Sequence, residues 1–479
     1  MKLRIKAVFV LIVLGLTYSC FEDNDDNAIS ASEIKDFVWK GMNAVYLYKQ
    51  NIPDLANDRF SSNNEYATYL NSFSTPESLF ESLIYERQTV DRFSWITNDY
   101  IALEEQLSGG LNFSNGMEAN LYLVPGSITE LYGVVRLVLP GSNADNQGLE
   151  RGQIFDKVDG VTLTLENWRQ LISGDSFTLN LANYNDNGTE DTDDDSLEST
   201  TDTVNLTKTS YTENPVYLSD IFQVDGENVG YLVYNGFTPA YDSQLNAVFG
   251  DFAANNVQHL ILDLRYNPGG NVGTATALGS MVTGQFNGDV FAKLNYNDEL
   301  AGNNSEYLFS NTLENGNTIN NLNLNKVYVL TTGSSASASE MIINSLRAHM
   351  DQVIQIGTTT TGKSQASVTI YDSPNLQREG ANPNHNYAMQ PLIAITVNKF
   401  DEQVPSSGLV PTIALEEVSY NYGTLGDVNE TLLAAALADI EGSSRLSIPQ
   451  FNFEVIGDSN KTVPFSDIMY IKNSVFTQE

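Results

Sequence analysis

Hydrophobic residues follow a helical pattern in the first part of the chain. Between residues 31–49, and again between 74–85, apolar side chains recur every three to four positions, which is the spacing of one face of an α-helix. Ser30 and Glu33 have the pattern of a capping box and predict the start of the first helix. Residues 31–108 are therefore predicted to form a small helical domain.

From residue 109 the pattern changes to short apolar or alternating runs separated by glycine and proline, which predicts β-strands. In 140–163 a strand leads to Pro-Gly-Ser, a short helix closes at Gly148, the chain turns at Gly152, and the next strand ends in Val-Asp-Gly. This order resembles a PDZ domain, so 109–210 is predicted to be PDZ-like, with a long acidic loop at 183–203. Such domains bind extended peptide ends as an added strand. A PDZ-shaped spacer that binds nothing is the alternative.

Residues 211–445 have the pattern of an α/β domain. Apolar runs that predict buried strands are GYLVYNGF, QHLILDLRYNPGG, KVYVLTT, VIQIG and LIAITVNKF. Helical stretches lie between them, notably 339–350, and a last helix is predicted with Asp427 as its cap. Buried strands that alternate with helices indicate a sheet covered on both faces. The chain as a whole is predicted to be a multidomain α/β protein, and residues 446–479 form a C-terminal extension whose mixed pattern predicts no element.

Composition limits the partners. The chain has 24 basic and 60 acidic residues and a formal charge of −36, which argues against binding to nucleic acid or to an anionic membrane surface. A single cysteine excludes an intramolecular disulfide and a thiolate zinc cluster. The aspartates of 183–203 do not have the spacing of a standard calcium loop, so a solvated loop is favoured. No metal and no cofactor is expected.

The first residues have the pattern of a targeting segment. Residues 1–19 combine three early basic residues with the apolar run AVFVLIVLGL, which is shorter than the roughly 20 residues of a spanning helix. The lone Cys20 that follows resembles the lipidated cysteine of a bacterial lipoprotein, and the acidic tether 20–30 resembles a surface-export signal of Bacteroidetes lipoproteins. The expected location is the bacterial cell envelope, with a lipid anchor in the outer membrane and exposure to the periplasm or the outer surface. A plain signal peptide with an incidental cysteine is the alternative.

The stretch TTGSSASASEMI, residues 331–342, lies between a predicted buried strand and a predicted helix. Small residues at such a turn let a substrate backbone come close, and the N–H groups at a helix start can bind a developing negative charge. A serine at this point is therefore well placed to act as a nucleophile.

A nucleophilic serine needs a base, and two kinds of base remain open. The three histidines, His259, His349 and His385, have no recognisable catalytic context, so a Ser-His-Asp triad is not supported. Lys363 follows a strand and a Thr/Gly turn in IGTTTTGKSQAS, and burial would lower the pKa of a lysine from its usual value of about 10.4. A solvent-exposed loop lysine is the alternative interpretation.

The segments LDLRYNPGG, SASASE and TGK, in this order after a PDZ-like segment, resemble the C-terminal processing peptidases, the tail-specific serine proteases. The resemblance covers roughly residues 110–430 and implies a peptidase domain of the ClpP/crotonase-like type. It implies that Ser337 is the nucleophile and Lys363 its general base. It also implies that the backbone N–H groups of Gly270 and Ala338 form the oxyanion hole.

Two departures from the family pattern concern the lysine. The interval between Ser337 and Lys363 is one residue longer than in the best-known members. Many members carry a glutamine four residues after the lysine that orients it; here that position is Ser367, and Gln365 lies two residues earlier. Gln365 or Ser367 is therefore the candidate for orienting the lysine.

The resemblance implies a serine endopeptidase that hydrolyses protein substrates through an acyl-enzyme and recognises them by their C-terminal tails. The alternative is a surface-anchored lipoprotein on the same fold that binds peptides or other ligands without catalysis. An intact serine, lysine and glycine set favours the peptidase.

Overall fold

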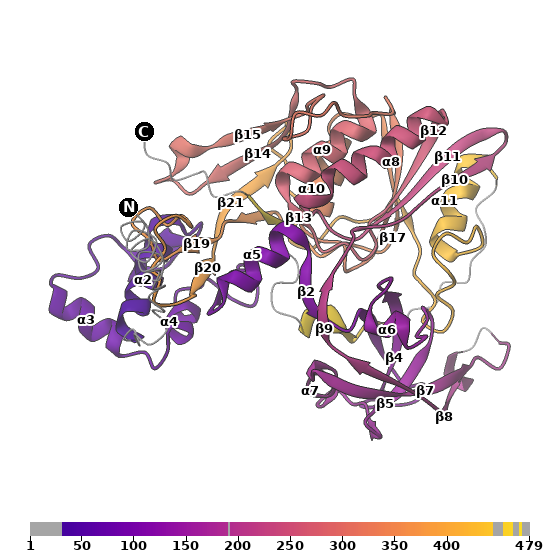
Figure 1. Ribbon diagram of the computed structural model, residues 1–479, viewed down its shortest axis with the longest axis horizontal. Helices are drawn as coiled ribbons and strands as arrows, with labels where there is room; N and C mark the ends of the chain where they lie inside the picture. The colour runs from indigo at the N-terminus through magenta and orange to yellow at the C-terminus, as the bar shows by residue number, and fades with distance from the viewer. Residues whose placement is uncertain (1–30, 190–191, 444–453, 463–468, 472–479) are drawn as a thin grey trace, which may run out of the picture.

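The computed structural model describes residues 31–189, 192–443, 454–462 and 469–471. It has three parts in chain order: an N-terminal helical region, a β-domain and an α/β domain. In Figure 1 the N-terminal helices lie on the left, the α/β domain at the upper right and the β-domain below it. This is the mixed α/β class that the sequence predicts.

The N-terminal region is built from short helices. They are α2 (Ala31–Val45), α3 (Asn63–Asn71), α4 (Pro76–Ser82) and α5 (Tyr100–Gly109). The two predicted helices are confirmed as α2 and α4, and each is shorter than its predicted range. The helices α3 and α5 are not predicted because neither has a continuous apolar stripe. The predicted cap Ser30 lies outside the described residues.

In the described part of the chain, the N-terminal helices share a hydrophobic core with the α/β domain. Val38 and Met42 of α2 and Leu79 of α4 are fully buried in one cluster with residues of the α/β domain. Strand β1 (Trp95–Thr97) pairs with β20 (Ala388–Gln390), a strand from far along the chain. The N-terminal region is therefore packed and hydrogen-bonded onto the α/β domain.

The β-domain is an antiparallel sheet with two short helices. Its strands are β3 (Met117–Leu123), β4 (Leu131–Val138), β5 (Ile154–Val158), β6 (Val161–Thr162), β7 (Ser176–Asn185) and β8 (Ser196–Thr207), and its helices are α6 (Asn143–Asn146) and α7 (Trp168–Ser173). The predicted order of strand, short helix, turn and strand is confirmed over β4, α6 and β5. Gly148 and Gly152 both have positive φ, as those turns require. Where the chain enters and leaves the domain, β2 (Leu111–Ser114) pairs with β9 (Thr209–Thr212).

The prediction of a long acidic loop over residues 183–203 is wrong in extent. Strand β7 continues to Asn185 and β8 begins at Ser196, so about half of the segment belongs to the paired hairpin strands. Tyr184 at the end of β7 donates a hydrogen bond from its hydroxyl to Asp195 at 2.6 Å. The aspartates lie mainly at the hairpin tip, and the alternating Thr, Tyr and Leu residues beside them favour strand.

The main sheet of the α/β domain has six strands. Their order is β10 (Val216–Val224), β11 (Glu227–Tyr234), β12 (Val257–Asp263), β16 (Lys326–Thr331), β17 (Gln352–Gly357) and β22 (Ile413–Ala414), and all pairs from β11 onward are parallel. Helices α8 (Asp242–Ala254), α9 (Val272–Thr283) and α10 (Ala338–Arg347) bury apolar residues against one face. Helix α11 (Thr431–Glu441) covers the other face, so the predicted two-sided covering is confirmed.

A second six-stranded sheet corrects the prediction of a single sheet. Its order is β13 (Gly270–Asn271), β24 (Met469–Tyr470), β18 (Gln365–Ser367), β21 (Leu392–Val397), β14 (Val290–Tyr296) and β15 (Ser305–Leu308). The fifth predicted strand, LIAITVNKF, forms β21 here because it pairs with β14 and β18 instead of the parallel strands. An apolar run predicts a buried strand but does not specify its neighbours.

The prediction that Asp427 caps the last helix is also wrong. Helix α11 begins after Glu430, whose side chain accepts a hydrogen bond from the Leu433 N–H at 2.9 Å. Asp427 instead accepts a hydrogen bond from the Asn429 N–H, in the turn before the helix. The capping carboxylate is therefore three residues later than predicted.

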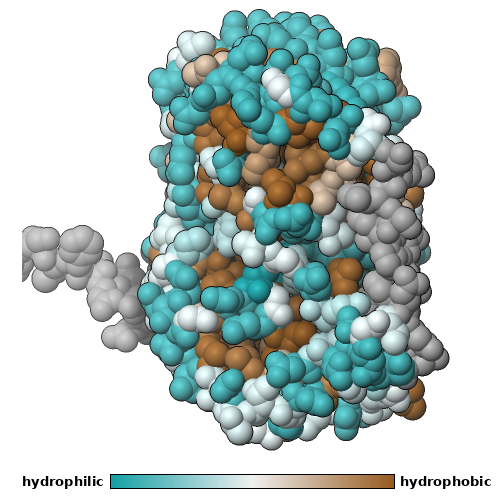
Figure 2. Space-filling view, turned by 90° about the vertical axis from the view of Figure 1, so that its right-hand side faces the viewer, coloured by the Kyte–Doolittle hydropathy of each residue, from teal (hydrophilic) through white to brown (hydrophobic). Residues whose placement is uncertain are grey.

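One face of the molecular surface is mainly polar. The face in Figure 2 is predominantly hydrophilic, and its hydrophobic residues gather in a few patches. No helix in the described part of the chain is both long and apolar enough to cross a bilayer.

Candidate active site

Ser337 lies at the turn between strand β16 and helix α10 and is completely buried. Its backbone has φ 66° and ψ −115°, a conformation that is uncommon for a residue other than glycine and is concentrated at functional sites. Among the described residues its Oγ has no hydrogen-bond partner. A buried serine hydroxyl without a hydrogen-bond partner is an exception in a folded protein, and a catalytic role is one explanation for such a group.

The serines around Ser337 hold its turn against the Asn-Pro-Gly-Gly turn that follows β12. The Asn267 carbonyl accepts hydrogen bonds from the Ala336 N–H at 3.1 Å and from Ser339 Oγ at 3.0 Å. Ser335 Oγ donates to the Leu264 carbonyl at 2.8 Å. These serines are therefore structural, and they place the two glycines of the neighbouring turn beside the nucleophile.

Gly270 lies where that turn enters strand β13, with φ 136°. A Cβ at this position would lie 2.5 Å from the Phe237 carbonyl oxygen, so only glycine fits. Gly269 and Gly270, together with Pro268, line a cavity of about 120 Å³. The turn thus presents its backbone to an open space, as an oxyanion hole requires.

Glu340, in the first turn of α10, connects the serine to the lysine. Its Oε2 accepts hydrogen bonds from the backbone N–H groups of Ser337 and Lys363, both at 2.8 Å. Its Oε1 accepts from the Gly362 N–H at 2.7 Å and from the Thr360 hydroxyl. Burial raises the pKa of Glu340 above its ordinary value, although these hydrogen bonds oppose the rise. One carboxylate therefore fixes the two turns relative to each other.

Lys363 is buried, in the turn before strand β18. The preceding Gly362 has φ 83°, and a Cβ there would lie 2.2 Å from the Ser406 carbonyl oxygen. The Thr361 N–H donates to the Ser335 carbonyl at 3.0 Å. The lysine turn is therefore packed directly onto the serine turn, and the solvent-exposed alternative for Lys363 is wrong.

The N-terminal region covers the lysine. Lys363 Nζ lies 4.8 Å from the centroid of the Phe93 ring, and Arg92 donates to the Gly362 carbonyl at 3.1 Å. The buried carboxylate of Asp91 accepts a hydrogen bond from the Phe93 N–H at 3.1 Å and holds this short segment in place. The Phe93 ring thus lies over the amine of Lys363, which is buried.

Gln365 and Ser367, the two candidates for orienting the lysine, both lie on β18. Gln365 Nε2 donates to the Tyr48 hydroxyl at 3.2 Å. Ser367 Oγ lies 3.3 Å from Gln390 Oε1 and donates to the Met469 carbonyl at 2.9 Å. These bonds anchor β18 to its neighbours, and a role in orienting Lys363 stays a prediction for both residues.

The histidines have partners away from the serine. His259 contacts Glu227, and His385 contacts Asp372. His349 contacts the Val290 carbonyl and Lys399. Within the described ranges none of them is hydrogen-bonded to Ser337. Nor do three His, Cys, Asp or Glu side chains gather, in the part of the chain that the structure describes, into a group that could hold a metal ion.

Sequence reasoning named Ser337, Lys363, Gly270 and Ala338, and the structure brings their segments together. It missed Glu340, although this residue is the last letter of the SASASE stretch, because a capping carboxylate and one that spans two turns look alike in sequence. It also missed Phe93, for which no local pattern exists. Cys20 lies outside the described residues.

Comparisons with known proteins indicate a peptidase family. Residues 228–378 match the model of peptidase family S41, and residues 33–95 match the model of the peptidase S41 N-terminal domain. No curated protein matches the chain in sequence.

Two solved structures are similar over most of the chain. One is a protein of Bacteroides fragilis NCTC 9343 assigned to the S41 proteases, with 27% identity and a TM-score of 0.66, covering 85% of this chain and 97% of that one. The other is the photosystem II D1 C-terminal processing protease, with 15% identity and a TM-score of 0.50, covering 86% of this chain and 99% of that one. The second similarity concerns the fold alone.

Proposed function

Residues 33–95 and 228–378 place this chain in peptidase family S41, and on that premise we propose that it hydrolyses peptide bonds with Ser337 as nucleophile and Lys363 as general base. The observation that carries this assignment is the carboxylate of Glu340, which accepts a hydrogen bond from the backbone N–H of each of these residues. Two buried turns held by one side chain keep the serine and the lysine in a fixed relation.

The reaction proceeds through an acyl-enzyme. The neutral amine of Lys363 takes the proton of the Ser337 hydroxyl as Oγ attacks the scissile carbonyl. The protonated amine then gives that proton to the leaving nitrogen, the C–N bond breaks, and Ser337 carries the acyl group. In the second half, water attacks the acyl carbon as Lys363 takes its proton; the lysine then returns this proton to Ser337 Oγ, the ester bond breaks, and the acid is released.

Backbone N–H groups stabilise the negative charge that develops on the carbonyl oxygen. We assign them to Gly270, whose turn lines the cavity, and to Ala338, which opens helix α10 directly after the nucleophile. Each such donor is worth on the order of 3 kcal/mol of transition-state stabilisation. The N-terminal end of α10 adds its partial positive charge.

The β-domain is the proposed substrate-binding domain and is PDZ-like in the order of its elements. A cavity of about 390 Å³ lies between it and the α/β domain, with Arg136 and Tyr266 among its lining residues. Asn112, Glu213 and Pro268 line both this cavity and the smaller one at Gly270. The two cavities are therefore adjacent, which supports a path by which the C-terminal tail of a protein substrate reaches the glycine turn at Gly270.

The test compares turnover of a denatured protein by the parent chain and by Ser337→Ala, Lys363→Ala and Lys363→Arg. We expect each variant to lose on the order of a thousandfold or more in kcat. The arginine variant distinguishes a base from a positive charge, because a guanidinium keeps its proton. Unchanged turnover by Ser337→Ala would overturn Ser337 as the nucleophile, whereas absence of turnover by the parent chain would favour the non-catalytic binding protein.

Attachment to the bacterial outer membrane through a lipid on Cys20 is part of the same proposal. It rests on the sequence alone. Replacing Cys20 by alanine is expected to move the protein from the membrane fraction to the soluble fraction, and equal fractionation of both proteins would contradict it.

A further inference from the structure

The C-terminal extension supplies a strand to the β-domain. Strand β23 (Gly457–Asp458) pairs antiparallel with β3, with Gly457 opposite Leu121 and Asp458 opposite Asn120. The Ile456 N–H donates to the Leu121 carbonyl at 2.8 Å. The edge of the sheet at which an added peptide strand would bind is therefore already occupied by this chain.

The other wall of this groove is helix α7. A Cβ on Gly457 would lie 2.8 Å from the indole ring of Trp168, the first residue of that helix. On the side of β3, the Ala119 N–H donates to Ser459 Oγ at 2.8 Å. The segment thus fills the groove between β3 and α7 at a point where only a glycine passes the tryptophan.

An acidic side chain anchors the segment. Asp458 is buried, and its Oδ2 accepts hydrogen bonds from Arg136 at 2.9 Å and from Ser334 Oγ at 3.0 Å. Arg136 is itself fully buried on β4 and also forms an ion pair with Glu118. The groove therefore binds a carboxylate carried by a side chain within a strand, and no free chain end is needed.

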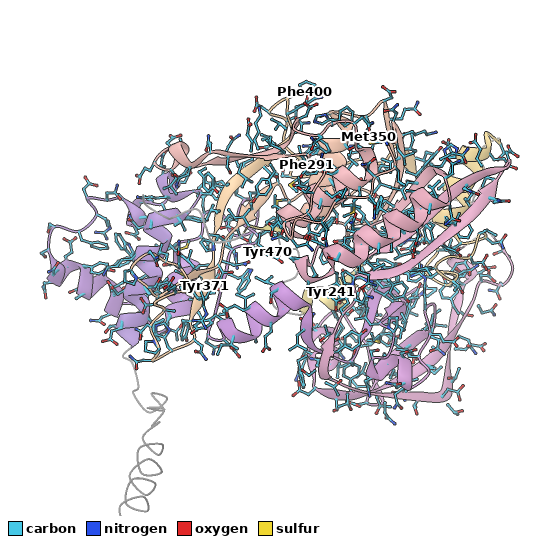
Figure 3. All side chains as sticks on the ribbon, turned by 45° about the horizontal axis from the view of Figure 1, so that its top comes forward. Tyr241, Phe291, Met350, Tyr371, Phe400 and Tyr470 are labelled. Carbon is cyan, nitrogen blue, oxygen red and sulfur yellow. The ribbon has the colours of Figure 1, made fainter. Side chains whose placement is uncertain are left out.

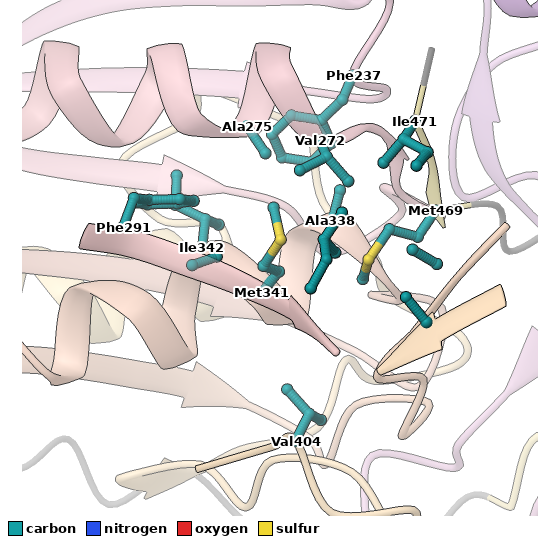
Figure 4. Packing of buried hydrophobic residues seen from close by; sticks show 14 of the residues in the cluster. Phe237, Val272, Ala275, Phe291, Ala338, Met341, Ile342, Val404, Met469 and Ile471 are labelled. Atoms are coloured by element: carbon teal, nitrogen blue, oxygen red, sulfur yellow. The ribbon is translucent and has the colours of Figure 1, made fainter. Parts of the chain in front are cut away.

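The extension also reaches the candidate active site. Strand β24 lies between β13 and β18, with Met469 opposite Gly270. The Met469 carbonyl accepts a hydrogen bond from Ser367 Oγ at 2.9 Å, and the Ile471 N–H donates to the Ser367 carbonyl at 3.1 Å. Met469 is buried in the cluster that contains Ala338, and Figure 4 draws the two side chains next to each other.

Tyr470 occupies the space in front of the glycine turn. It lines the same cavity as Gly269 and Gly270, and its hydroxyl donates to the Leu107 carbonyl of α5 at 2.6 Å. Figure 3 places its side chain in the middle of the molecule, between the N-terminal helices and the α/β domain. A substrate backbone that approaches Gly270 would meet this tyrosine.

We propose that the C-terminal segment is an internal ligand of this enzyme. Residues 456–459 occupy the peptide groove and residues 469–471 occupy the cleft beside Gly270, so a substrate must displace both before Ser337 can act. The ligand class of the groove is an extended peptide strand with an aspartate that meets Arg136. The groove half of the proposal stands on geometry alone, and the cleft half rests on the function proposed above.

The groove is tested by binding, without turnover. A fluorescent peptide with the sequence of residues 454–462 is titrated into full-length Ser337→Ala protein that also carries Gly457→Val, which would force the segment away from Trp168. We expect saturable binding, at least tenfold weaker for a peptide with alanine at the position of Asp458. The matched control protein carries Gly302→Val instead, at a position with open space around it. Because its groove stays filled by its own segment, we expect it to bind the peptide at least tenfold more weakly than the Gly457→Val protein does.

Turnover tests whether occupancy restrains the enzyme. With Ser337 intact, Gly457→Val is expected to raise kcat/KM for a denatured protein at least threefold, chiefly by lowering KM, and Gly302→Val to leave it unchanged. Asp458→Ala keeps the backbone of the segment and should also raise kcat/KM. This variant replaces Gly457→Val in the test if the valine variant does not fold.

The outcomes separate the two proposals. Equal peptide binding by the Gly457→Val and Gly302→Val chains, or equal binding of the aspartate and alanine peptides, would overturn the groove assignment. Unchanged kcat/KM in both Gly457→Val and Asp458→Ala would overturn self-inhibition while the catalytic assignment stands. Turnover that survives Ser337→Ala would remove the proposed function and leave the binding result in force.

Discussion

At the level of single residues, the geometry of the site depends on the carboxylate of Glu340. It accepts hydrogen bonds from the Ser337, Gly362 and Lys363 N–H groups and from the Thr360 hydroxyl. Four donors directed at one buried carboxylate leave no room for water as a substitute, and a displacement of about 1 Å between reacting groups can cost on the order of a hundredfold in rate. Glu340 is thus a positioning residue for both candidate catalytic groups.

Glu340→Gln is the prediction at this scale. The amide NH₂ would face N–H donors where the carboxylate accepts from them, so at least one turn must shift. We expect kcat to fall by roughly tenfold to a hundredfold with KM little changed, and the free energy of unfolding to fall by about 1–3 kcal/mol. Steady-state kinetics and urea unfolding measure both, with the exposed Glu441→Gln at the end of α11 as control. A wild-type kcat in Glu340→Gln would contradict the positioning role.

At the level of elements, the lysine turn is fixed by backbone packing. Gly362 approaches the Ser406 carbonyl, and Gly408 approaches the Thr360 carbonyl, so closely that a Cβ would lie 2.2 Å and 2.0 Å from the respective oxygen. Both glycines have positive φ. The two segments therefore pack through their main chains, which sets the position of Lys363 independently of its own side chain.

Substituting alanine separates backbone strain from collision. Gly362→Ala adds a Cβ at φ 83° that meets the Ser406 carbonyl oxygen at 2.2 Å, whereas Gly380→Ala adds one at φ 77° in open space. Both should lose about 1–2 kcal/mol of stability from the left-handed conformation. Only Gly362→Ala is expected to lose turnover, by roughly a hundredfold. Equal kinetics for the two variants would show that the close packing does not position the lysine.

At the level of the whole molecule, a buried charge cluster joins the β-domain to the α/β domain. Glu417 accepts hydrogen bonds from Arg151 of the β-domain at 2.6 Å and from Arg265, after β12, at 2.9 Å. Burial alone would raise the pKa of Glu417, but the two guanidinium groups outweigh it and lower the pKa to about 2. The relative placement of the two domains is thus linked to the ionisation of one carboxylate.

This linkage predicts a dependence of stability on pH. The pKa of Glu417 is lowered from 4.5 to about 2 on folding. Its ionisation therefore contributes about 3 kcal/mol to the free energy of unfolding. This contribution is present above pH 4.5 and is lost as the pH falls toward 2. Glu417→Gln should therefore be less stable than the parent at pH 7, and the difference should narrow between pH 4.5 and 2. Urea unfolding across this range measures it, with the exposed Glu150→Gln as control. If Glu417→Gln is less stable than the parent by the same amount at every pH, the lowered pKa of Glu417 is contradicted.

The sequence by itself determined the features that depend on local pattern. Helix α2, the four apolar strands of the main sheet and the order of β4, α6 and β5 follow from hydrophobic spacing and turn residues. The strand and the helix around TTGSSASASEMI are both strongly patterned, so a serine of this turn is a candidate nucleophile, and the family resemblance selects Ser337 among them. Interactions between residues close in sequence are enough to specify such helices, strands and turns, because neighbouring residues determine the local backbone conformation.

Only the tertiary structure decided which distant segments meet. Phe93 lies over Lys363, and β21 joins a second sheet, because of partners that no local pattern specifies. The C-terminal extension predicts no element by itself, since its short strands β23 and β24 exist only as additions to the edges of β3, β13 and β18. Backbone hydrogen bonds to a preformed edge supply the order that its own side chains do not.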